Sequence, residues 1–251
     1  MDIKKEIMNE IHKLYSADGF QGADNWNKVR SSSIWRNSEN LPDKELLYEG
    51  LQASRGLDLF PDKTFDENIN HAKKMIESPL SVDDQARLEE LKEFKILDNI
   101  DNVYELGFRC PKLLKLYEGM GKQAYGFDVV NVNVLIGQYL GYNCEFHDLS
   151  SDEPLFFEEN SLIIAYHVFE HLPDPQKAIR KVYDAMEDNS FFHIEVPTEG
   201  EINSSLGHFY AFKPGFLRNM IENFGSGVHK FELINQAKRS PATQSILCAK
   251  Q

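Results

Sequence analysis

Short apolar runs alternate with amphipathic segments from about residue 103 to the end of the chain. Short apolar runs are typical of buried strands, whereas apolar residues that recur every three to four positions are typical of helices packed on a core. The predicted strands are residues 103–106, 124–129, 143–147, 161–167 and 191–196, and the predicted helices are residues 111–120, 133–140, 175–186 and 214–224. Because helices fall between strands, the pattern predicts a parallel sheet with helices on both faces.

The chain ends on two further predicted strands, residues 230–235 and 244–249, with the turn-rich segment KRSP and no helix between them. Strands joined without a helix pair antiparallel, as a hairpin. The predicted fold class is therefore α/β, a Rossmann-like mixed seven-stranded sheet with a terminal antiparallel hairpin and an N-terminal helical extension.

The first part of the chain has helical periodicity without strands. Ile3, Ile7, Ile11 and Leu14 lie on one face of a predicted amphipathic helix that needs a partner surface. The predicted helices are residues 2–15, 41–54, 66–77 and 81–94, the last with Ser81 as its cap. We therefore divide the chain into residues 1–98, a helical extension for substrate capping or dimerisation, and residues 99–251, a Rossmann-type domain.

Composition narrows the class of protein. Lys and Arg number 27 against 40 Asp and Glu, and a net charge of -13 argues against nucleic acid as a partner. No apolar run approaches the roughly 20 residues that span a bilayer, so we expect no membrane span and a cytoplasmic location. Cys110, Cys144 and Cys248 are widely spaced in apolar or strand-like runs, which indicates reduced core thiols.

Carboxylates at the ends of the first two strands predict a nucleotide site. Glu105 ends the first strand just before Gly107, and Asp128 ends the second strand 23 residues after Glu105. That separation fits one strand-helix-strand unit, in which an acidic residue accepts hydrogen bonds from ribose hydroxyls. Gly107 lets the backbone approach a ligand closely.

These residues, with later stretches, resemble the class I S-adenosylmethionine-dependent methyltransferases of small-molecule type. The similar stretches are VYELG at 103–107, GFD at 126–128, HDL at 147–149, AYHVFEHLPDP at 165–175, FHIEVP at 192–197 and GHFYAFKP at 207–214. The resemblance implies S-adenosylmethionine as cofactor and S-adenosylhomocysteine as product. The cofactor-binding residues that it implies are Glu105, Gly107, Phe108, Arg109, Asp128, Asp148, Leu149 and His167.

The sequence departs from this family at the glycine loop. Relatives carry a Gly-x-Gly-x-Gly-like loop, whereas this chain has Gly107-Phe108-Arg109-Cys110-Pro111. Pro111 suits the first position of the next helix. Arg109 stands where a glycine is expected, and we hypothesise that it binds the cofactor carboxylate.

Histidines supply the candidate acceptor chemistry, because imidazole is a base near neutral pH. His167, His171, His193 and His208 lie in segments expected at the carboxyl end of the sheet, where open α/β folds bind ligands. We predict His171 as the catalytic base, with His208 and Tyr210 closing over the acceptor. The alternative for each histidine is a hydrogen bond to loop backbone.

The spacing His167-x-x-Glu170-His171 is also that of metal ligands. Pro173 and Pro175 exclude the long helix of inverted zinc peptidase motifs. The site residues are predicted without a metal, and a bound divalent cation stays an alternative.

The predicted function is methyl transfer from S-adenosylmethionine to a hydroxyl of a small polar metabolite, with a sugar or nucleotide-linked sugar of glycan or capsule biosynthesis favoured. Trp26, Trp35 and neighbouring arginines in residues 16–40 either grip such a ligand or anchor an extended arm. The main alternative is a non-catalytic scaffold or regulatory relative that has lost donor binding. An NAD-dependent oxidoreductase is disfavoured by the missing glycines, and a homodimer through the N-terminal helices is a possible assembly.

Overall fold

The computed structural model describes residues 65–172, 174–198, 208, 210–222, 231–237 and 243–250. The predicted helices at 2–15 and 41–54, and both tryptophans, lie outside the described residues. The predictions from residue 65 onward can be compared with the structure element by element.

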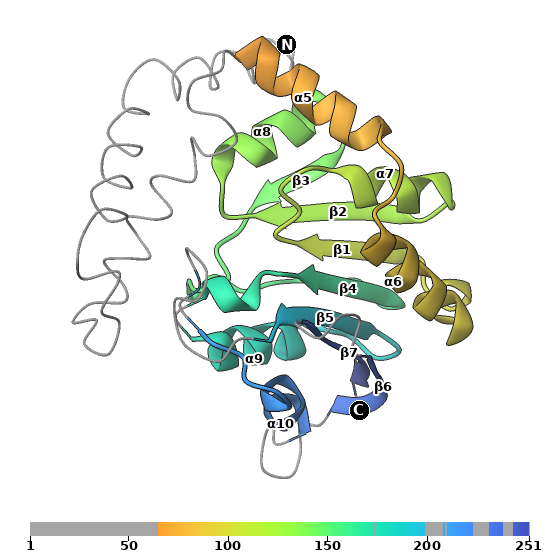
Figure 1. Cartoon of the computed structure of the whole chain (residues 1–251), viewed down its shortest axis with the longest axis vertical. Coiled ribbons are helices and arrows are strands. Elements are labelled where there is room, and N and C mark those ends of the chain that lie inside the picture. Colours follow the sequence, from red (N-terminus) through yellow and green to blue (C-terminus); the bar gives the residue numbers. More distant parts are fainter. Residues whose placement is uncertain are drawn as a thin grey trace, which may run out of the picture.

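A seven-stranded sheet forms the centre of the molecule, in the order β3-β2-β1-β4-β5-β7-β6 (Figure 1). Its strands are β1 Asn102–Leu106, β2 Gln123–Asp128, β3 Asn143–Phe146, β4 Ser161–Tyr166, β5 Phe191–Pro197, β6 Phe231–Ala237 and β7 Thr243–Lys250. The first five strands pair in parallel, and β7 lies between β5 and β6, antiparallel to both. The predicted fold class and terminal hairpin are confirmed.

Helices connect the strands as the periodicity predicted. They are α5 Phe65–Glu77, α6 Val82–Glu93, α7 Lys112–Gly119, α8 Asn131–Tyr139, α9 Pro175–Ala185 and α10 Phe216–Glu222, with 3₁₀ turns η2 Ile96–Asp98 and η3 Phe169–His171. Asp174 caps α9, where its side chain accepts a hydrogen bond of 3.0 Å from the Lys177 N–H, and Pro175 opens the helix.

The core lies on both faces of the sheet, because successive strand residues point to opposite faces. Val103 packs in one cluster with Leu91 of α6 and Leu114 of α7. Tyr104 packs in another with Ile179 of α9 and Leu217 of α10. The central strands are therefore buried on both sides, which explains their continuous apolar runs.

Helix α6 packs on this core, and helix α5 packs beside α8. Ile69 and Ala72 of α5 form a separate buried cluster with Val130 and Ile136. Ser81 caps α6 by the predicted means: its Oγ accepts from Asp84 N–H, and the Asp84 carboxylate accepts from Ser81 N–H. Leu91 of α6 and Ile96 and Leu97 of η2 thus share a core cluster with the sheet, whereas α5 packs beside α8.

Two further predictions can be compared with the described residues. Cys110, Cys144 and Cys248 are free and buried, as predicted. Among the described helices, none is long and apolar enough to cross a bilayer.

Candidate functional site

A cavity of about 570 Å³ opens at the carboxyl ends of β1, β2 and β4. This edge is where parallel α/β sheets bind ligands. Residues from three strand ends, from η3 and from helices α5 and α6 surround it. The residues that line it include Asp84, Arg87, Glu105, Gly107, Phe108, Arg109, Asp128, Asn133, His147, Leu149, Tyr166, His167 and His171.

Gly107 makes the turn that forms the cavity floor. Its φ of +72° lies in the left-handed region, and its N–H donates to the Phe127 carbonyl at 2.6 Å. A Cβ at this position would lie 2.7 Å from Cγ2 of Val168, closer than real Cβ contacts. Both constraints require glycine here.

Phe108 and Arg109, the bulky residues of the loop that follows Gly107, are accommodated in different ways. The Phe108 ring is buried, and a Cβ added at Gly126 would lie 2.6 Å from its Cδ1. Gly126 therefore makes room for Phe108 in the core. Arg109 is exposed at the cavity with φ +47°, so this turn carries a strained non-glycine residue.

Asp128 organises the loop as well as lining the cavity. Its Oδ2 accepts from the Arg109 N–H at 2.9 Å and from Asn133 Nδ2 at 3.1 Å, and its Oδ1 accepts from the Val130 N–H at 2.8 Å. The side chain is 6% exposed. The carboxylate thus fastens the turn after β1 to the turn after β2 and still faces the ligand space.

Glu105 presents an unsatisfied acceptor to the same cavity. The residue is 8% exposed, and its Oε2 has no hydrogen-bond partner within the described residues. Burial, followed by the negative charges of Asp84 and Asp128, raises the pKa of Glu105 well above its ordinary value. A cationic ligand group would relieve that cost.

His167 sits between two buried carboxylates. Its Nδ1 lies 3.2 Å from Glu170 Oε1 and its Nε2 lies 3.3 Å from Glu195 Oε1. These carboxylates, Glu170 first, raise the pKa of His167 to about 9. At neutral pH His167 therefore offers the cavity a positive charge rather than a base.

Arg87 of α6 completes this charged network. Its Nε donates to Glu195 Oε2 at 3.2 Å, its Nη2 bonds Glu195 Oε1, and its guanidinium lies 4.2 Å from the centre of the Tyr166 ring. Burial opposes the charge of Glu195, but His167 and Arg87 together hold the pKa of Glu195 below its ordinary value. Arg87 and Glu195 are buried and paired, and Arg87 and the exposed His167 line the cavity.

The three residues predicted to contact the methyl acceptor, His171, His208 and Tyr210, lie at different positions relative to the cavity. His171 lines the cavity, and its ring packs edge-on against that of His208 with 4.8 Å between centroids. His208 and Tyr210 are not among the lining residues; Tyr210 donates its backbone N–H to the Glu170 carbonyl at 3.2 Å and packs on Phe212. The structure therefore brings His171 and His208 together.

Of two other predicted cofactor-binding residues, Leu149 and Asp148, one lines the cavity and the other does not. Leu149 lines it and is buried, whereas Asp148 does not line it and accepts from the Ser150 N–H at 2.8 Å.

The expectation that His193 lies at the carboxyl end of the sheet is wrong. It is the third residue of β5, has no exposed surface, and shares hydrogen bonds with Tyr166 Oη (2.8 Å) and Ser245 Oγ (3.0 Å). The strand continues past it to Pro197.

Sequence reasoning missed several lining residues. Asp84 and Arg87 lie on α6, about twenty residues before β1, and only tertiary packing brings them to the cavity. His147 directly follows β3 and is buried with no partner for its Nε2 within the described residues. The position of His147 directly after a strand can be recognised from the sequence. No such local pattern marks Asp84 and Arg87 on α6.

Comparisons with known proteins concern the fold. No protein-family model matches the sequence, and no curated protein matches it. The PH0226 protein from Pyrococcus horikoshii OT3 has a TM-score of 0.51 and 12% identity over 70% of this chain and 93% of its own. The cyclase SpnF has a TM-score of 0.52 and 11% identity over 72% of this chain and 92% of its own.

The observed sheet is Rossmann-like and ends in an antiparallel hairpin, as expected for a chain that resembles class I methyltransferases. The chain has the class I methyltransferase fold. The magnesium protoporphyrin IX methyltransferase ChlM from Synechocystis PCC 6803, solved with bound SAH, is also similar, with 11% identity and a TM-score of 0.49 over 97% of this chain and 100% of its own. At such low sequence identities, the methyltransferase fold indicates where a ligand binds, whereas the kind of ligand has to be inferred from the residues of the site.

Proposed function

We propose that this protein is an S-adenosylmethionine-dependent methyltransferase and that the cavity at the ends of β1, β2 and β4 is its donor site. One observation carries the proposal: the buried carboxylates of Glu105 and Asp128 face one cavity on either side of the Gly107 turn. The donor has a cationic amino group and two ribose hydroxyls, which need acceptors of this kind.

Each predicted donor contact has a side chain suited to it. Asp128, which lines the cavity at the end of β2, is the proposed acceptor for the ribose, and Glu105 receives the ammonium group. Arg109 and protonated His167 offer positive charge to the donor carboxylate. When bound, the donor supplies an electrophilic methyl group, and the chain has to hold the acceptor in line with it.

For the acceptor we propose a hydroxyl of a small polar metabolite, with a sugar or nucleotide-linked sugar as the first class to test. The support is the type of residue on the acceptor side, which is rich in imidazole and hydroxyl groups. His171 is the proposed base, and His208, whose ring contacts it, and Tyr210 are the proposed cover. His167 is unsuited as the base because the pKa of its imidazole is raised to about 9.

Calorimetry with S-adenosylhomocysteine tests the donor site. We expect binding at one site per chain, weakened by Arg109→Ala and by Glu105→Gln. Glu93→Gln is the matched control, since Glu93 is an exposed glutamate at the end of α6 and does not line the cavity. Absence of binding to the wild-type chain would favour the alternative, a non-catalytic relative that acts as a scaffold or regulator.

Transfer of label from methyl-labelled S-adenosylmethionine tests the reaction itself. The fold alone does not settle it, because SpnF carries the fold and is named a cyclase. Label in a sugar or sugar nucleotide, reduced by His171→Ala, is the expected result. Donor binding with label transfer only to other acceptors would contradict the sugar assignment and leave the methyltransferase assignment standing.

Residues 1–98 are proposed to cap the substrate or to mediate a homodimer. The amphipathic pattern of residues 2–15 supports this role, because its apolar face needs a partner surface. Light scattering of the full chain gives the mass in solution, and a monomer would exclude the dimer.

A further inference from the structure

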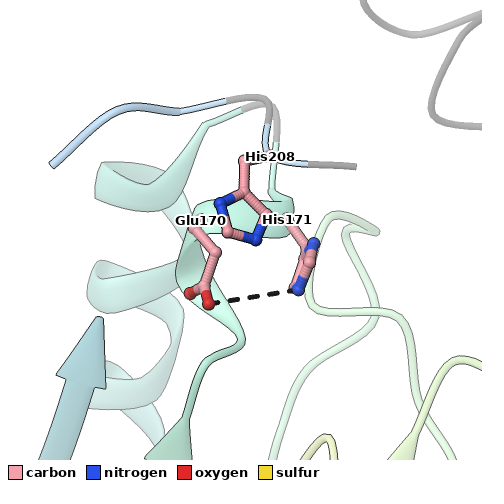
Figure 2. A group of neighbouring side chains, drawn as sticks. All are labelled: Glu170, His171 and His208. Atoms are coloured by element: carbon pink, nitrogen blue, oxygen red, sulfur yellow. Dashed lines mark ion pairs between the residues drawn. The ribbon is translucent and has the colours of Figure 1, made fainter. Parts of the chain in front are cut away.

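Glu170, His171 and His208 form a compact group beside the proposed donor cavity. Their potential ligand atoms, one from each residue, lie within 4.8 Å of one another. Figure 2 shows Glu170 and His171 on the η3 turn and His208 reaching the same point from the segment that follows β5. Two segments almost forty residues apart in sequence thus converge on one point.

The Glu170 carboxylate is the most informative member of the group. It has no exposed surface, and neither oxygen has a hydrogen-bond partner within the described residues. His167 Nδ1 lies 3.2 Å from its Oε1, and His171 Nε2 lies 4.0 Å from the same oxygen. A buried carboxylate without hydrogen bonds is costly, and a metal cation would offset more of that cost than the contact with His167 does.

The donor types favour a particular class of cation. Two imidazoles and one carboxylate suit zinc and other divalent transition metals, whereas magnesium and calcium take oxygen ligands. Ligand atoms on a zinc ion lie about 3.3 Å apart, given bonds of about 2.0 Å, so side-chain shifts of about 1 Å would complete the set. We propose that Glu170, His171 and His208 bind one divalent transition-metal ion, such as zinc.

The ligand set differs from the spacing His167-x-x-Glu170-His171 in the sequence. Both ring nitrogens of His167 face carboxylates, Glu170 at 3.2 Å and Glu195 at 3.3 Å, and His167 is not in the group. Its contact with Glu170 is instead of the kind that orients a metal-binding carboxylate. His208 takes the third position.

The site has two consequences for the molecule. His171 also lines the donor cavity, so a three-ligand metal with a free coordination position would lie at the cavity edge, and the metal-bound imidazole of His171 would no longer be free to act as the base proposed above. His208 and Tyr210 belong to one segment, and Tyr210 N–H already donates to the Glu170 carbonyl at 3.2 Å. The metal would fasten that segment to η3.

Equilibrium dialysis of the full, tag-free chain against zinc, followed by elemental analysis, tests the proposal without any methyl donor. We expect about one tightly held zinc ion per chain and a rise in the thermal unfolding midpoint. Glu170→Gln, His171→Ala and His208→Ala should each weaken zinc binding about tenfold or more. The matched control is His71→Ala on α5, which should bind zinc like the wild type.

Cobalt substitution gives a second, spectroscopic measurement of the same site. The wild-type chain should give the intense visible absorption of four- or five-coordinate cobalt, and His208→Ala should change it. Wild-type protein that retains no zinc after dialysis overturns the proposal. So does a folded His208→Ala protein with wild-type zinc affinity and cobalt spectrum. Neither result affects the donor-binding test.

Discussion

At the scale of single residues, Glu105 is the group whose charge depends most directly on the ligand. Burial and the charges of Asp84 and Asp128 raise its pKa, and a bound ammonium group would lower it again. Binding then releases a proton while the free side chain is protonated, so affinity should rise with pH until the pKa of the free protein is passed.

We therefore predict that affinity for S-adenosylhomocysteine increases with pH above the ordinary glutamate value of 4.5, as long as the ligand ammonium stays charged. Glu105→Gln should bind more weakly and lose most of this increase. Calorimetry across the pH series provides the measurement. An unchanged slope in Glu105→Gln would mean that another group titrates with binding.

Gly107 gives a second prediction at this scale. Gly107→Ala should destabilise the protein by about 2 kcal/mol, from the left-handed backbone and the 2.7 Å approach to Val168 Cγ2, and should weaken donor binding. Gly121→Ala is the matched control, because Gly121 has a similar φ of +80° with no atom within 4 Å of its Cβ position. Urea unfolding and calorimetry of both variants separate the effect of the Val168 contact from the effect of backbone strain. Equal losses of unfolding free energy in the two variants would show that the Val168 side chain moves to accommodate the added Cβ.

At the scale of elements, α6 is joined to β5 through Arg87 and Glu195. Removing one partner of a buried ion pair leaves the other charge uncompensated, which costs more than the pair contributes. We predict that Arg87→Met lowers the free energy of unfolding by about 3 kcal/mol and weakens donor binding, since Arg87 lines the cavity.

Adding Glu195→Gln to Arg87→Met should recover part of that stability, because it removes the stranded charge. Urea unfolding of the single and double variants measures the coupling. Strictly additive losses would show that Arg87 acts on stability through its stacking with Tyr166 rather than through Glu195.

At the scale of the whole molecule, the sheet buries His193 at its centre. Burial lowers the pKa of His193 to about 3, while the unfolded chain has the ordinary value near 6.5. Below about pH 6.5 the unfolded state takes up a proton that the folded state refuses, so stability falls as pH falls toward 3. Glu90 Oε2 lies 3.5 Å from its Nε2.

We predict that the wild-type free energy of unfolding falls from pH 6.5 to pH 5 more steeply than that of His193→Asn, by up to about 1.4 kcal/mol per pH unit. The comparison is between slopes, because the substitution also removes hydrogen bonds to Tyr166 and Ser245. Thermal unfolding in buffers of matched ionic strength checks it. Parallel slopes would place the acid sensitivity in the carboxylates.

Local sequence determined the elements of this protein. The apolar runs of β1, β4 and β5 specify strands buried on both faces, and Ser81 and Asp174 specify where α6 and α9 begin. Gly107 and Asp128, placed where strands end, were enough to predict the edge of the sheet at which the cavity lies. These signals are local, because hydrogen bonding within a turn and side-chain periodicity depend only on near neighbours.

The tertiary structure decided which side chains meet. It brought Arg87 from α6 to Glu195 on β5, placed His193 in the core rather than at the sheet edge, and set His208 beside Glu170 where the spacing had suggested His167. Such pairings join residues tens of positions apart. No local pattern encodes them, because they depend on how helices and loops pack over the finished sheet.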